Sequence, residues 1–151
     1  MSRRWWAPTP DSSETPELWP DLVTLAATVL GEAEGESYIG KLAVAWVVMN
    51  RVADSRWPDE PGAVCLQKLQ FSCWNVGSSR LHSMFNPRKT IKERLWNDCF
   101  KAAMGAVFGL DPDPTSGANH YLAPKSLKFM PRWYDASKVV AKIDDHEFLF
   151  L

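Results

Sequence analysis

Hydrophobic residues recur at helical spacing near the start of the chain. After Pro20, Asp21 supplies an acidic residue suited to a first helical turn. The apolar positions that follow fall on one helix face. They are Leu22, Leu25, Ala26, Val29 and Leu30. Because Gly35 is a natural helix end, the pattern predicts a helix over about 20–33.

A second apolar block begins after Ser37, a favourable N-cap residue, and predicts a helix that runs to about Ala53. Residues 42–49 are apolar on nearly every side of such a helix. A helix of this kind must be covered on most faces, so we expect it to be the central element of the fold.

Weaker patterns follow this block. Residues 60–68 predict a short helix, and a polar loop continues to Asn86-Pro87. A third long helix is predicted over about 90–108, because Thr90 and Glu93 have the spacing of a capping box.

Segments 120–123 and 147–151 are short and rich in aromatic residues, which favours strands. The whole pattern therefore predicts a mainly α (α+β) fold with a central buried helix and a small β element. A chain of 151 residues is the size of one domain. We assign 18–151 to that domain and 1–17, which holds three prolines, to an irregular N-terminal arm.

Composition narrows the range of partners. A net charge of −1 argues against nucleic acid or a membrane surface as a partner held by long-range electrostatics. No apolar run approaches the roughly 20 residues that span a bilayer, so we expect no stable membrane insertion. The first residues lack the apolar core of a signal peptide. We expect a monomer.

The three cysteines are an odd number and match no zinc-binding spacing. Reduced thiols packed as small hydrophobic residues are the simplest interpretation. A bridge between Cys65 and Cys73 after export stays open, because the sequence does not give their separation. No other residues have metal-ligand spacing, so we expect no metal and no cofactor, and activity in EDTA.

The segment 31–36 holds three carboxylates at alternate positions between two apolar helices: Glu32, Glu34 and Glu36. Negative charge at a helix C-terminus opposes the helix dipole. The pattern therefore indicates either a solvated acidic turn or a carboxyl with a function. Glu32 lies within the first helix and is the best placed to be partly buried. Burial favours a protonated carboxyl, which a glycosidic acid requires.

The stretch from Gly31 to Val52 resembles the opening of the spore cortex-lytic (SleB/CwlJ-type) cell-wall hydrolase family, which reads G-E-[AS]-R-G-E-x-x-x-G-x-x-A-V-A-x-V-[IV]-L-N-R-V. The resemblance continues, in order, at 70–72, 113–121, 131–133 and 143–148.

This resemblance implies a lysozyme-like fold that acts on the β-1,4 bond between N-acetylmuramic acid and N-acetylglucosamine. It makes Glu32 the catalytic residue and Glu36 the family's second Glu. The chain departs from the family pattern at Glu34, where Arg is usual, at Asn119, where Thr is frequent, and at Leu122, where His is frequent.

With one dependable carboxyl, a lytic transglycosylase that leaves 1,6-anhydro ends is favoured, because ordinary glycosidases need two carboxylates. A hydrolytic muramidase acting on the same bond stays open. So does an amidase or peptidase with a Cys73–His120 pair, and so does a non-catalytic wall-binding module.

A glycan groove needs aromatic platforms beside amides and hydroxyls. The candidate substrate-binding residues are Glu36, Gln70, Ser72, Trp74, Asn75, His120, Tyr121 and Trp133. Each tryptophan can instead be a core residue, and His120 can be a structural histidine. For His146 a structural role is favoured.

The expected partner is the glycan strand of peptidoglycan. Without a signal peptide or wall-binding repeats, the chain looks like a phage endolysin, a bacteriolytic and hence antimicrobial enzyme. It would be made in the host cytoplasm and would reach the periplasm and cell wall after a holin opens the membrane. A bacterial hydrolase exported by another route is the alternative.

Overall fold

The structure is a computed structural model, and it describes residues 19–68, 70–75, 77–85 and 93–151. The proposed arm, 1–17, and the proposed capping residue Thr90 lie outside the described residues.

Three long helices form the body of the molecule: α1 (Asp21–Ala33), α2 (Tyr38–Val52) and α6 (Glu93–Val107). The first two match their predicted ranges closely, and α6 ends near the predicted position. Ser37 caps α2 as expected, because its hydroxyl accepts a hydrogen bond from the Gly40 N–H. None of the described helices is both long and apolar enough to cross a membrane.

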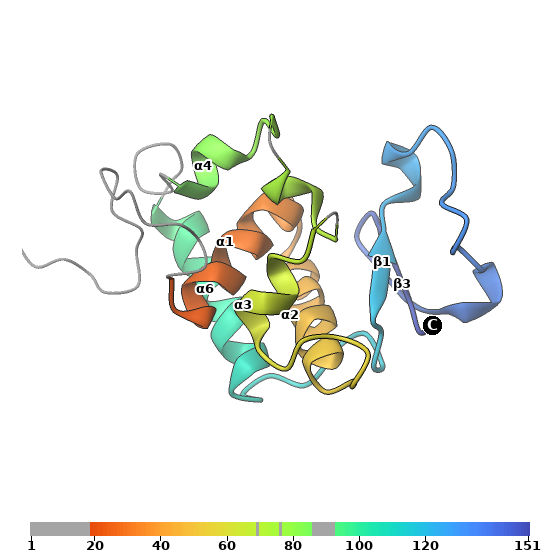
Figure 1. The fold of residues 1–151 in the computed structure, drawn as a ribbon, viewed down its shortest axis with the longest axis horizontal. Coiled ribbons are helices and arrows are strands. Elements are labelled where there is room, and N and C mark those ends of the chain that lie inside the picture. Colours follow the sequence, from red (N-terminus) through yellow and green to blue (C-terminus); the bar gives the residue numbers. More distant parts are fainter. Residues whose placement is uncertain (1–18, 69, 76, 86–92) are drawn as a thin grey trace, which may run out of the picture.

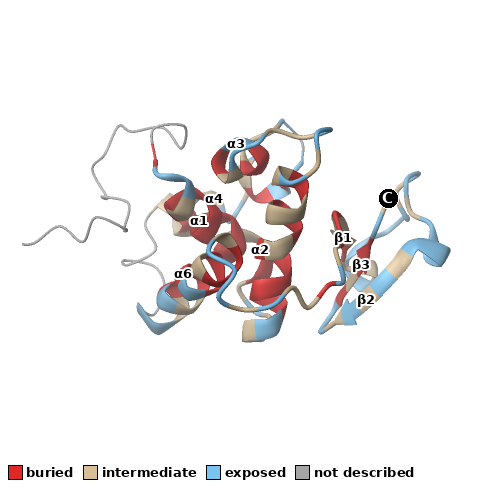
Figure 2. Ribbon diagram, turned by 90° about the horizontal axis from the view of Figure 1, so that it is seen from below, coloured by how far each residue is buried: buried red, intermediate tan, exposed pale blue. Residues whose placement is uncertain are grey.

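Two helices share the central position. α1 contacts α2, α3, α4 and α6, and most of its residues are buried. α2 packs on α1 and α6 with one side and reaches strands β1 and β2 with another. Figure 2 shows α2 between the other helices and the sheet. The predicted central helix therefore links the helical part of the fold to its β element.

Shorter helical segments cover the ends of α1. The predicted helix within 60–68 is α3 (Pro61–Cys65). The segment predicted as a polar loop contains a 3-10 turn, η2 (Ser72–Trp74), and a five-residue helix, α4 (Leu81–Phe85). Two further 3-10 turns, η3 (Pro124–Ser126) and η4 (Ala136–Lys138), lie between the strands. Figure 1 shows α3 and α4 on the helical side of the molecule.

The β element is an antiparallel sheet of β1 (His120–Leu122), β3 (His146–Leu149) and β2 (Val139–Ile143), in that order across the sheet. The strands predicted near 120–123 and 147–151 are β1 and β3. β2 was not predicted. The register pairs Tyr121 with Phe148.

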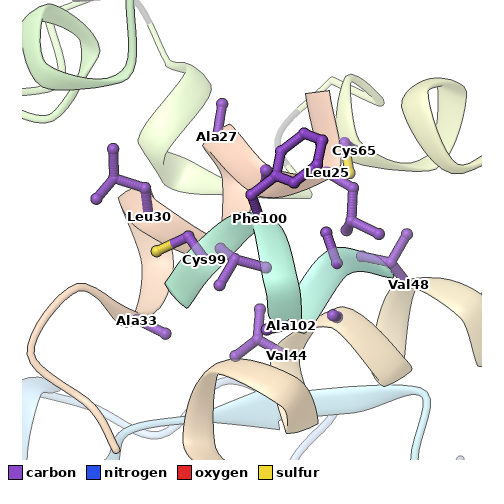
Figure 3. Packing of buried hydrophobic residues seen from close by; sticks show 14 of the residues in the cluster. Leu25, Ala27, Leu30, Ala33, Val44, Val48, Cys65, Cys99, Phe100 and Ala102 are labelled. Atoms are coloured by element: carbon purple, nitrogen blue, oxygen red, sulfur yellow. The ribbon is translucent and has the colours of Figure 1, made fainter. Parts of the chain in front are cut away.

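The core has two parts. The larger cluster joins α1, α2 and α6 through side chains such as Leu25, Val44 and Phe100 (Figure 3). The smaller cluster lies under the sheet, where Val47 of α2 meets Phe148 of β3. Burial on both sides of α2 therefore fixes the sheet against the helices.

Candidate active site

A cleft of about 520 Å³ lies where the end of α1 meets the sheet. Its walls come from α1, α2, the η2 segment, β1, β3 and the loop that follows β1. Of the residues singled out in the sequence, it brings together Glu32, Gln70, Ser72, His120, Tyr121 and Trp133. Among the described residues that line it, Glu32 alone carries a carboxyl group.

Glu32 occupies the last turn of α1, as predicted, and is partly buried. The backbone N–H of Cys73 donates to its Oε1 at 3.4 Å. A carboxylate that accepts such a bond is held in a defined orientation toward the cleft. The side chain therefore does not project freely into bulk water.

Gly31 permits this contact. A Cβ at position 31 would lie 2.6 Å from the Cys73 Cβ and 2.6 Å from the Met84 Sδ. Such distances are well inside van der Waals contact, and because the Cys73 Cβ is attached directly to the backbone, any side chain would push the η2 segment away from α1. The glycine that weakens the helix pattern in the sequence therefore brings the Cys73 amide to the carboxyl next to it.

Tyr121, on strand β1, also interacts with Glu32. Burial, followed by the negative charge of the Glu32 carboxylate and a hydrogen bond to it, raises the pKa of Tyr121 well above its ordinary value. The phenol therefore stays protonated and donates to the carboxylate. Its ring packs against His146 at a centroid distance of 5.2 Å and against Phe148 at 5.8 Å.

The other two carboxylates of the acidic segment face elsewhere. Glu34 pairs with Arg80. The Lys41 ammonium, on a side chain that is almost fully buried, donates to the backbone carbonyls of Glu34 and Glu36. A cation at these carbonyls offsets the unfavourable position of negative charge at the end of α1.

Glu36 does not line the cleft, although it was predicted to bind substrate. Its Oε1 lies 3.5 Å from the Nδ1 of His146, a buried residue that does line the cleft. A structural role was expected for His146. Its contact with Glu36 is consistent with that role, and His146 also forms part of the cleft wall.

Arg51 is a cleft residue that the sequence reasoning missed. It is buried near the end of α2, where its Nε donates to the Asn119 carbonyl at 2.7 Å and its Nη1 donates to Gln70 Oε1 at 3.3 Å. Burial lowers its pKa. The signal in the sequence was a charged residue two positions after the apolar run of α2, 42–49.

His120 is held in one tautomer. Its Nδ1 lies 2.8 Å from Asn119 Oδ1, which also accepts from the Leu151 N–H. Because that oxygen only accepts, Nδ1 carries the proton and Nε2 is left as an acceptor. Burial, with smaller effects from Arg51 and Arg56, lowers the pKa of His120 from its ordinary 6.5 to about 4. At neutral pH this imidazole is uncharged.

Two predicted substrate-binding residues lie outside the cleft lining. Trp74 is packed against the main core, its ring 6.2 Å from that of Trp19, and its Nε1 donates to the Thr28 hydroxyl at 2.9 Å. Asn75 is exposed and ends the η2 turn. The aromatic side chain that does line the cleft from the side of the β1–β2 loop is Trp133, 5.1 Å from the His120 ring.

The cysteines are free and buried. The pKa of the Cys73 thiol is raised, mainly by burial and next by the negative charge of the Glu32 carboxylate. Burial also raises the pKa values of Cys65 and Cys99 to about 12. A nucleophilic cysteine requires the opposite shift, so the arrangement disfavours a Cys73–His120 amidase. Within the described ranges, no group of three His, Cys, Asp or Glu side chains is placed to hold a metal ion.

A helical domain with one carboxyl at the tail of a buried helix, facing a cleft bordered by a small sheet, has a lysozyme-like architecture. A family model described as Cell Wall Hydrolase matches residues 35–149. The chain belongs to this cell wall hydrolase family, as its motifs predicted.

Curated relatives include spore cortex-lytic enzymes. One from Bacillus cereus is 30% identical over 128 residues, which cover 85% of this chain and 43% of that protein. One from Bacillus subtilis is 28% identical and is covered over 37% of its length. The chain thus spans less than half the length of these relatives.

Solved structures confirm the predicted fold class. The catalytic domain of the germination-specific lytic transglycosylase SleB from Bacillus anthracis aligns with a TM-score of 0.63 and 26% identity, over 94% of this chain and 100% of that one. The catalytic domain of Bacillus cereus SleB aligns with a TM-score of 0.64 and 24% identity, over 99% and 98% of the two chains.

Proposed function

We propose that this protein is a lytic transglycosylase that cleaves peptidoglycan between N-acetylmuramic acid and N-acetylglucosamine. Glu32 serves as both general acid and general base. The observation that carries the proposal is the single carboxyl group among the described cleft-lining residues. The similarity to a protein named as a lytic transglycosylase supports it.

One carboxyl is enough for this reaction. Protonated Glu32 gives its proton to the glycosidic oxygen as the bond from that oxygen to C1 of the muramic acid breaks. The N-acetylglucosamine leaves with a new hydroxyl. The Glu32 carboxylate then takes the proton of the muramic C6 hydroxyl, whose oxygen bonds to C1 and closes a 1,6-anhydro ring. Glu32 ends protonated, and no water is consumed.

The remaining cleft residues suit a sugar chain. Trp133 offers an aromatic face to a sugar ring. The exposed side chains of Gln70 and Ser72 offer an amide and a hydroxyl, and His120 offers the acceptor Nε2. These groups are neutral, as binding to a mostly uncharged disaccharide backbone requires.

Product analysis of digested sacculi tests the proposal. The wild type should release muropeptides with anhydro-muramic ends, and Glu32→Gln should lower turnover by about 10²–10⁴-fold while still sedimenting with sacculi. Reducing muramic ends without an anhydro species would instead establish the hydrolytic muramidase. Full lysis by Glu32→Gln would refute both glycosidic mechanisms.

The same preparation separates the remaining rivals. Cys73→Ala should retain lysis, since the thiol of Cys73 is buried beside Glu32. A loss of activity without structural change would favour the amidase. If a suspension of sacculi lost no more turbidity with the wild type than without protein, only the wall-binding module would remain.

We propose further that the activity serves phage-induced host lysis, with the enzyme made in the cytoplasm and reaching the wall through a holin-opened membrane. The wall-degrading chemistry is what supports this context. Cells that express the protein should stay intact until their membrane is permeabilised and then lyse rapidly. Lysis on expression alone would favour a bacterial enzyme with its own export route.

A further inference from the structure

The loop after β1 exposes large apolar side chains at short intervals. The exposed fractions are 42% for Leu127, 79% for Phe129, 44% for Met130 and 41% for Trp133. Cations alternate with them at Lys125, Lys128 and Arg132, all of them exposed. Figure 1 shows this stretch (blue) at the end of the molecule away from α6. Exposed apolar groups gathered in this way mark interaction sites.

The loop has an inner and an outer part. Leu127 and Trp133 line the cleft and so belong to the candidate active site. Phe129 and Met130 do not line it. We call residues 128–132 the loop tip. The Lys128 ammonium lies 5.7 Å from the centroid of the Phe129 ring, so charge and apolar surface stand side by side there.

Exposure alone does not distinguish the loop tip. Phe108 and Leu110, after α6, are 63% and 72% exposed. Carboxylates follow that pair, at Asp111 and Asp113. Residues 124–138, by contrast, hold four cations and one carboxylate in a chain whose net charge is −1. One of these cations, Lys125, lies 3.7 Å from Asp145. The loop tip and the Phe108–Leu110 pair are therefore similar in apolar exposure but differ in the charge of their surroundings.

The net charge of −1 argues against attraction of the whole chain to a membrane, but the charge of this loop is locally positive. We propose that the loop tip binds the surface of an anionic lipid bilayer. Lys128 and Arg132 would meet the headgroup phosphates, while Phe129 and Met130 enter the interfacial region. A thioether has no flat ring for a sugar to stack on, and a glycan gains little from burying it. A lipid interface gains from burying both side chains. Such a small anchor gives weak, reversible binding.

Co-sedimentation with vesicles tests the proposal on the whole chain. Equimolar phosphatidylcholine and phosphatidylglycerol should bind the wild type about tenfold or more tightly than phosphatidylcholine alone. Lys128→Gln with Arg132→Gln should weaken that binding by about 25-fold, since each cation contributes about fivefold. Phe129→Ser with Met130→Ser should also weaken it, on both kinds of vesicle.

The matched control is Phe108→Ser with Leu110→Ser, which removes equally exposed apolar groups beside carboxylates and should leave vesicle binding unchanged. Raising NaCl to about 0.5 M should weaken wild-type binding, a readout that needs no variant. Equal binding to both lipid mixtures, or equal losses in control and tip variants, would overturn the proposal. So would tip variants that lose binding to sacculi but keep vesicle binding, which would assign the tip to the glycan. No measurement on vesicles depends on the glycosidic activity.

Discussion

The immediate surroundings of Glu32 define the site at the scale of single residues. The Cys73 N–H and the Tyr121 hydroxyl both form hydrogen bonds to its carboxyl group. Both groups donate, and both interact best with the ionised carboxylate. Together they orient the carboxyl group within the cleft. In the proposed mechanism, Tyr121 would act as a positioning residue for Glu32.

Tyr121→Phe should lower kcat about 10–100-fold with little change in KM, because a hydrogen bond to a charged group contributes roughly 1.5–3 kcal/mol. Turnover of solubilised glycan strands would measure it. The control is Tyr134→Phe. The hydroxyl of Tyr134 donates to Glu147 at 2.8 Å, and Tyr134 does not line the cleft. A rise in KM alone would show that Tyr121 contacts substrate instead.

His120 should make folding sensitive to mild acid. The folded protein keeps this imidazole neutral down to about pH 4, whereas the unfolded chain takes up the proton near pH 6.5. The unfolded state therefore binds more protons between these values, and the free energy of unfolding falls as the pH falls through this range. Above pH 6.5 the effect vanishes. The free energy of unfolding, measured by urea titration at several pH values in this range, should depend less steeply on pH for His120→Gln than for the wild type. The same pH dependence in both proteins would contradict a lowered pKa at His120.

The sequence placed the candidate catalytic residue, Glu32, in the cleft, but it did not predict the residues that contact it. Glu32 could be selected because helix pattern and motif agree on it. Tyr121 was placed among substrate-binding residues, since its contact with Glu32 joins positions far apart in the chain. Arg51 was missed because a charged residue after an apolar helix usually lies in solvent. Here it is buried against Asn119 and Gln70.

At the scale of elements, the close approach of η2 and α4 to α1 shapes the site. Gly31→Ala should destabilise the fold by about 1–3 kcal/mol through overpacking. It should also lower kcat, because the Cys73 amide moves away from Glu32. Urea unfolding and glycan turnover would measure the two effects.

Gly35→Ala is the control for that substitution, four residues further along. A Cβ there meets nothing within 4 Å, and the backbone φ of Gly35 is not positive. It should be neutral or slightly stabilising. Comparable losses at both positions would indicate a general intolerance of the segment and would remove the packing explanation.

The elements that could be predicted are those whose pattern is long. The helices α1, α2 and α6 each bury a continuous stripe, and that stripe is visible in the sequence. α4 has five residues, which is too few for a period to appear. β2 carries a real alternation, with Val140 and Lys142 exposed between partly buried neighbours, but it is half-buried at best and lacks the aromatic residues of β1 and β3.

At the scale of the whole molecule, the cleft exists because the sheet is held against the helices. No local pattern gives that arrangement. Part of it depends on Asp144, in the turn between β2 and β3. Its Oδ2 accepts hydrogen bonds from the Ser37 N–H at 2.9 Å and the Ser37 hydroxyl at 2.7 Å, at the start of α2. Gly40 makes room for it, since a Cβ there would lie 2.5 Å from the same oxygen.

Asp144→Gly should therefore loosen the sheet from α2. Glycine tolerates the positive φ of 52° at this position, so the substitution removes the carboxylate without adding backbone strain. We expect a loss of about 1–2 kcal/mol in the free energy of unfolding, as for other lost helix caps. We also expect a fall in kcat/KM, because Tyr121 and His146 reach the cleft from the sheet.

Asp145→Ala is the neighbouring control. The Asp145 carboxylate is largely exposed and lies 3.7 Å from the Lys125 ammonium. Such surface ion pairs contribute about 0–1 kcal/mol to the free energy of unfolding. If Asp145→Ala lowered kcat/KM as much as Asp144→Gly, the cleft would depend on the hairpin as a whole and not on its link to α2.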